Sequence, residues 1–145
     1  MRKRNLILLI VFMVVIPVLL SGCFHRPKVA VLTVEFNPNQ VPLNTWVTVV
    51  ETLRELNGVG VSLNYFKEEW FDQQGNITDG WEREGAAAES MFQSVFGTSY
   101  IPGNGELSRS YSGGTATPVK LVRTYRGIDD NGNTVRASGK LLFGL

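Results

Sequence analysis

The stretch "PVKLVRTYRGIDDNGNTVRASGKLLF", residues 118–143, alternates side chains in the manner of a β-hairpin. In its first half, every second residue falls on one face, namely Val119, Leu121, Arg123 and Tyr125. In its second half, the corresponding set is Val135, Ala137, Gly139, Leu141 and Phe143. The halves are joined by "DDNGN", where Asn-Gly tolerates the positive φ of a tight turn. The pattern predicts two antiparallel strands, and the rest of the fold must supply their partners.

Four earlier segments are also typical of strands. They are "VAVLTVEF" (29–36), "TWVTVVET" (45–52), "GVGVSLNYFKEEWFD" (58–72) and "ELSRSYSG" (106–113). In the third of these, Val59, Val61, Leu63 and Tyr65 are expected on one face. The region 85–97 lacks this alternation and is rich in alanine, which predicts a short helix or an ordered loop. About seven short strands separated by turns predict an all-β, antiparallel sandwich.

This pattern resembles the bacterial immunoglobulin-like domains of exported proteins. The resemblance rests on residues 47–76, which are similar to the second and third strands of such domains, and on residues 127–143, which are similar to the closing hairpin. The Cys pair of antibody-type domains is missing, and Trp46 or Trp70 is expected in a core position similar to that of their central tryptophan. The resemblance implies a fold and no activity.

The first residues predict export. Basic residues at 2–4 precede an apolar run from Leu6 to Leu20, which is roughly 22 Å long as a helix and shorter than a bilayer core requires. The run ends in Leu20-Ser21-Gly22-Cys23, which resembles the lipobox of bacterial lipoproteins. That resemblance implies cleavage before Cys23, a diacylglyceryl group on its thiol, and an acyl chain such as palmitate on the new amino terminus. An ordinary signal peptide or a retained membrane anchor are the alternatives.

The expected organisation is a signal peptide (1–22), a lipidated tether (23–28) and one β-sandwich domain (29–145). The tether is so short that it spans under about 20 Å, so we expect the domain close to a cell or outer membrane, on its extracytoplasmic side. Arg26 and Lys28 would then lie near lipid head groups or simply solvate the linker. Without residues 1–22, 11 of the 14 basic residues remain against 13 acidic ones, which argues against binding of nucleic acid. Cys23 is the only cysteine, so no disulfide is expected.

Few residues suggest catalysis or metal binding. The only histidine, His25, lies in the tether, which argues against a catalytic triad or a histidine metal site. A glycan hydrolase needs two carboxylates, and its candidate acids are Glu82, Glu84 and Glu106, of which the first two are expected in a polar turn. Adjacent Glu68 and Glu69 would point to opposite faces of a strand. Asp129, Asn131 and Asn133 have the spacing of a calcium loop, but hairpin chemistry explains them better.

Large side chains are concentrated between residues 81 and 101. They are Trp81, Met91, Phe92, Phe96 and Tyr100, and they either close one end of the core or contact a partner. The sequence therefore favours a membrane-anchored, non-enzymatic binding or structural module, with no cofactor beyond its lipid and with an envelope protein or glycan as partner. An alternative is a subunit of a surface assembly that docks through residues 81–101 or an edge strand. A cell-wall glycan hydrolase is less favoured.

Overall fold

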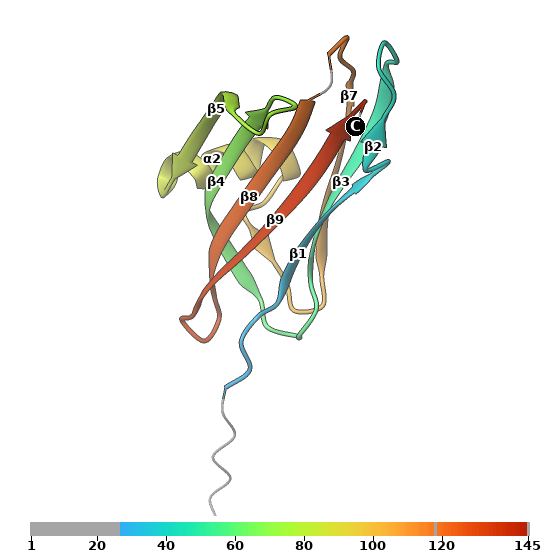
Figure 1. Ribbon diagram of the computed structural model, residues 1–145. Coiled ribbons are helices and arrows are strands. Elements are labelled where there is room, and N and C mark those ends of the chain that lie inside the picture. The colour runs from blue at the N-terminus through green and yellow to red at the C-terminus, as the bar shows by residue number, and fades with distance from the viewer. Residues whose placement is uncertain (1–26, 118, 145) are drawn as a thin grey trace, which may run out of the picture.

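The computed structural model describes residues 27–117 and 119–144, so the predicted signal peptide, Cys23 and His25 lie outside the described residues. Two β-sheets pack face to face, and one short helix lies against them (Figure 1). The expectation of an all-β, immunoglobulin-like sandwich with one short helix is confirmed. The described residues form nine strands, two of which are only two residues long.

The two sheets are unequal. The smaller has the order β1-β3-β7 and consists of β1 (Leu32–Asn37), β3 (Val47–Glu55) and β7 (Glu106–Gly113). The larger has the order β2-β9-β8-β4-β5. Its strands are β2 (Gln40–Val41), β9 (Thr134–Phe143), β8 (Val119–Asp129), β4 (Val61–Phe71) and β5 (Ile77–Glu84). The short strand β6 (Tyr100–Ile101) also pairs with β4. All of these pairings are antiparallel except the short parallel contact of β2 with β9.

The hairpin β8–β9 forms as predicted, with Leu121 opposite Leu141 and Tyr125 opposite Ala137. Its turn has Gly132 at φ 82°. The Asp129 carboxylate accepts hydrogen bonds from the backbone N–H of Asn131 (3.0 Å) and of Asn133 (2.8 Å). The interpretation of these residues as hairpin chemistry is confirmed.

The prediction that alternate residues from Val59 to Tyr65 share one face holds only for the first half of β4. Val61 and Leu63 are buried, but the register shifts between Leu63 and Tyr65, so the alternation restarts and Phe66 is buried instead of Tyr65. A β-bulge inserts one extra residue and moves every later side chain to the other face. Trp46, one of the two proposed core tryptophans, is 74% exposed, so that alternative is wrong, whereas Trp70 packs against the core.

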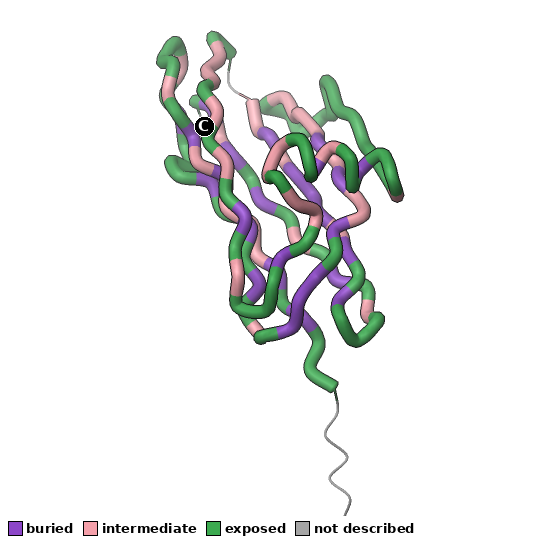
Figure 2. The backbone as a smooth tube through the Cα atoms, turned by 180° about the vertical axis from the view of Figure 1, so that it is seen from behind, coloured by how far each residue is buried: buried purple, intermediate pink, exposed green. Residues whose placement is uncertain are grey.

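Residues 77–84 form strand β5 rather than the polar turn expected for Glu82 and Glu84. The helix α2 (Ala86–Phe96) follows directly and confirms the helical alternative for this region. It ends at Gly97, whose left-handed conformation (φ 77°) lets its N–H bond to Gln93 O. Its buried residues Ala88 and Phe92 face the core, so the helix closes part of the space that the smaller sheet leaves open (Figure 2).

Candidate functional site

A network of charged side chains crosses the centre of the sandwich. In the smaller sheet Glu51 and Arg109 are cross-strand neighbours, and in the larger sheet Glu68 and Arg123 are. The Arg123 guanidinium joins the two sheets, because it donates from Nη1 to Glu51 (2.7 Å) and from Nε to Glu68 (2.8 Å). Arg109 donates to the same oxygen of Glu51 (2.7 Å). Two carboxylates thus meet two guanidinium groups, and the buried layer carries no net charge.

Aromatic side chains complete the hydrogen bonding of this network. Tyr125 donates its hydroxyl to Glu51 (2.6 Å), and Trp70 donates its indole N–H to Glu68 (3.0 Å). Burial raises the pKa of Tyr125 well above its ordinary value, and the charge of Glu51 adds to this, so the hydroxyl stays protonated and can donate. The Tyr111 ring lies against the Arg123 guanidinium, 4.7 Å from its centroid.

The network separates two apolar clusters. The cluster nearer the N-terminal tether includes Leu53 and Phe66, and the other includes Val49 and Leu121. Glu51 lies between Val49 and Leu53 in β3, and Arg123 lies between Leu121 and Tyr125 in β8, the two residues with which the alternation had grouped it. Sequence reasoning missed their role because it could not show that the two side chains would meet across the sheets.

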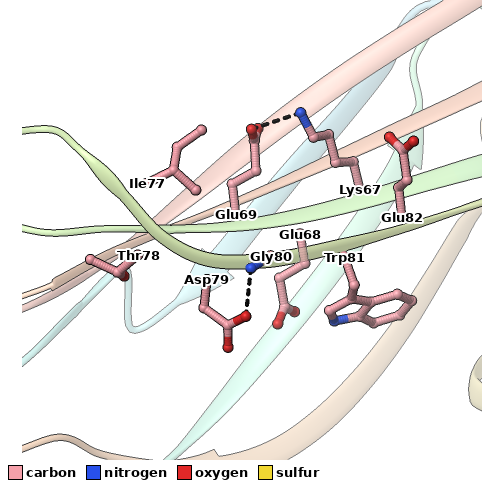
Figure 3. Close-up of a pocket in the computed structure, with 9 residues that line it drawn as sticks. All are labelled: Lys67, Glu68, Glu69, Ile77, Thr78, Asp79, Gly80, Trp81 and Glu82. Carbon is pink, nitrogen blue, oxygen red and sulfur yellow. Dashed lines mark hydrogen bonds and ion pairs between the residues drawn. The ribbon is translucent and has the colours of Figure 1, made fainter.

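An open groove of about 600 Å³ surrounds the edge strand β5. It is lined by Lys67, Glu68, Glu69, Ile77, Thr78, Asp79, Gly80, Trp81 and Glu82. Figure 3 shows Lys67, Glu69 and Glu82 on one side of the β4–β5 ribbon, and Glu68, Asp79 and Trp81 on the other. Four of the lining residues are acidic and one is basic, so the groove favours cationic groups. Glu68 belongs both to this groove and to the buried network.

Trp81 is a partly exposed aromatic wall of the groove. Its ring packs on Phe66 with centroids 4.7 Å apart, which fixes its position on the core. The guanidinium of Arg83 lies 5.2 Å from the ring centroid. The Trp81 ring is therefore rigidly held and already accepts a cationic group from its own strand.

The other large residues predicted between 81 and 101 are not one surface. Phe92 is fully buried and packs on Tyr125, and Met91 and Phe96 pack against the same core. Tyr100 is exposed and lies opposite Ser62, on the outer face of the larger sheet. Trp81 lies opposite Glu68, whose side chain faces inward, so Trp81 is on the inner face. The structure thus divides this set into core and surface residues, because the helix faces the core while β5 and β6 lie at the sheet margin.

The candidate acids of a hydrolase are not brought together. Glu82 accepts a hydrogen bond from the Tyr65 hydroxyl, and Glu84 forms an ion pair with Arg126. Glu106 lies in the other sheet, where it forms an ion pair with Arg54 (2.8 Å). Among residues 27–117 and 119–144, no group of three or more His, Cys, Asp or Glu residues is placed to hold a metal ion, and no helix is long and apolar enough to cross a membrane.

No protein-family model matches the chain, and no curated protein matches it either. Some solved structures match the chain at low similarity. The CARDB domain of a Pyrococcus furiosus protein, solved with two metal ions, is 14% identical over 80% of this chain and 90% of its own, with a TM-score of 0.42. A Bordetella pertussis protein is 13% identical over 80% of this chain and 96% of its own, with a TM-score of 0.48. The fold class rests on the strand pairing of this chain itself.

Proposed function

We propose that the chain is a membrane-anchored envelope lipoprotein whose β-sandwich is a non-enzymatic binding module. We further propose that a partner protein docks by adding an extended segment along β5. The observation that carries this proposal is the exposed edge of β5, which pairs only with β4 among the described strands and borders a groove walled by Trp81.

Several features favour β5 over the other strand edges. All eight of its residues are exposed, and at ~3.4 Å per residue they span roughly 27 Å. The margin at β1 is covered because this strand packs against β9, and β7 is flanked by α2. The charges of Asp79, Glu82 and Arg83 discourage unspecific pairing of exposed edges. Two backbone groups of β5 have partners within the strand, since Gly80 N–H donates to Asp79 Oδ1 (2.8 Å) and Glu82 O accepts from Arg83 Nη1 (2.9 Å). A docking segment would displace these two side chains and pair with the backbone groups that they cover.

The anchor is supported by the sequence Leu20-Ser21-Gly22-Cys23 at the end of the apolar run. Two or three acyl chains on Cys23 would hold the domain stably at the membrane, whereas one chain would hold it marginally. Metabolic labelling with palmitate should mark the wild-type protein and leave the Cys23→Ser variant unlabelled. Equal labelling of both would refute the anchor.

The docking edge can be tested in cells with a photo-crosslinking amino acid. At Thr78 in β5 it should yield a discrete adduct that disappears when Trp81→Ala is also introduced. The control position is Thr48 in β3, which is exposed on the outer face of the smaller sheet. Docking at β5 would be contradicted by equal adduct yields at both positions. It would also be contradicted if Trp81→Ala left the adduct yield at Thr78 unchanged.

A further inference from the structure

Exposed apolar side chains gather at the end of the sandwich where the N-terminal tether joins it. Five of the eight large apolar residues classed as exposed in the described chain lie there, each 38–56% exposed: Val29, Val31, Leu56, Tyr100 and Ile128. We call these five residues the tether-end collar. The remaining three are Trp46, Ile77 and Trp81. Figure 1 shows the chain entering at this end, with the C-terminus at the opposite end.

The collar occupies both outer faces of the sandwich. On the smaller sheet, Leu56 N donates to Val31 O (2.9 Å), which extends the pairing of Leu32 with Glu55 by one residue. Residues directly opposite each other share a face, so the Val31 and Leu56 side chains are neighbours. On the larger sheet, Tyr100 and Ile128 both lie opposite Ser62, which is exposed. Apolar groups therefore flank this end on two sides.

The segment that leaves this end is fixed to it. Lys28 O accepts a hydrogen bond from the side-chain amide of Asn131 (2.7 Å), and Val29 O accepts one from that of Asn57 (2.6 Å). The Ala30 N–H donates to the Asp129 carboxylate (3.0 Å). The domain therefore cannot turn freely about residues 28–30, at the end where the described chain begins.

We propose that the tether-end collar lies against the lipid bilayer and orients the domain upright on it. This inference rests on the proposed lipid anchor at Cys23, because only residues 24–27 separate that cysteine from the fixed segment 28–30. At most about 3.5 Å per residue, this tether keeps Lys28, at the collar end of the domain, within about 20 Å of the anchored residue. The bilayer is the occupant because it is the one apolar surface that the short tether holds against this end, and Lys28 adds a positive charge suited to anionic lipids.

An upright domain keeps the binding edge away from lipid. Strand β4 rises ~3.4 Å per residue, so the path from Val61 at the tether end to Phe71 spans roughly 34 Å. Strand β5 pairs only with its upper part, from Tyr65 to Phe71. The groove beside Trp81 would therefore face the space beyond the membrane surface.

The test uses the full lipidated chain in vesicles of phosphatidylethanolamine and phosphatidylglycerol that contain a nitroxide-labelled lipid. Since the Cys23 thiol is expected to carry lipid, one introduced cysteine can be labelled selectively with a fluorophore. The label is placed at Leu56→Cys in the collar or at Trp46→Cys at the opposite end. The nitroxide lipid should quench the label at position 56 several-fold more strongly than the label at position 46.

A matched pair of variants separates contact from simple proximity. Ile128→Asp places a charge in the collar and should reduce the quenching at position 56, whereas Ile77→Asp charges a still more exposed isoleucine, in β5, and should not. If the protein floats with the vesicles but both positions are quenched equally or not at all, the collar proposal is wrong and the anchor stands. If the protein neither floats nor incorporates palmitate, the anchor and the collar proposal both fail.

Discussion

Removal of the Arg123 side chain should strongly destabilise the fold. Its guanidinium bridges Glu51, which is fully buried, and Glu68, which is about nine-tenths buried. Arg123→Met keeps a long apolar side chain but removes the charge and both ion pairs. Glu51 then retains only Arg109 and Tyr125 as partners, and Glu68 retains only Trp70.

The expected loss follows from the burial of these carboxylates. Removing one partner of a buried ion pair costs about 3–5 kcal/mol, because a charge is left without compensation in a medium of low polarity. Domains of this kind have unfolding free energies of about 5–15 kcal/mol, so the loss is a large fraction of the total. In urea, with m of about 1–3 kcal/mol/M, the unfolding midpoint followed by tryptophan fluorescence should fall by at least ~1 M.

The matched control is Arg54→Met, which removes an arginine from an exposed pair with Glu106. Such pairs contribute about 0–1 kcal/mol, so this variant should unfold near the wild-type midpoint. The double variant Glu51→Leu with Arg123→Met should recover part of the loss, because it removes a buried carboxylate together with its partner. The reasoning is refuted if Arg123→Met costs no more than Arg54→Met.

Two further predictions concern acid stability and the packing of β1 on β9. Burial by itself raises the pKa of Glu55, but hydrogen bonds from backbone amides outweigh it and lower the pKa from 4.5 to about 2. Its contribution to stability is therefore complete above pH 4.5 and is lost as the pH falls towards 2, so Glu55→Gln should flatten the decline of unfolding free energy in that window. A Cβ on Gly139 would lie 2.9 Å from the Phe36 ring, so Gly139→Ala should cost about 1–3 kcal/mol in urea unfolding. Gly113→Ala adds a methyl group in open space and should change the midpoint little.

The sequence predicted the parts of the fold in which a strand pattern is local. The alternation around "DDNGN" placed Leu121 and Leu141 correctly because each strand has one buried face, and the Asn-Gly turn joins them in a fixed register. The same alternation grouped Arg123 with Leu121 and Tyr125 on one face. It could not pair Arg123 with Glu51, since the distance between these side chains depends on how two separate sheets pack.

Strand β5 and the bulge in β4 could not be predicted in this way. All residues of β5 are exposed, so the strand has no apolar alternation, and its conformation comes from pairing with β4. The bulge between Leu63 and Tyr65 has no local signature in "SLNYF", where the apolar residues fit either register. The groove was therefore missed as a whole, although Trp81 had been recognised as a large side chain in need of an explanation.

The groove exists because the two sheets differ in width. The larger sheet extends to β5 beyond the cover of the smaller sheet, and α2 covers only the region where Phe92 packs on Phe66. Beside this margin, Glu68 connects the groove to the buried network, since Arg123 and Trp70 hold its carboxylate from within. The Trp81 wall is likewise fixed by Phe66. A surface supported in this way loses little conformational freedom when it is covered, so the unequal sheets supply both an open edge and a rigid platform for the proposed docking.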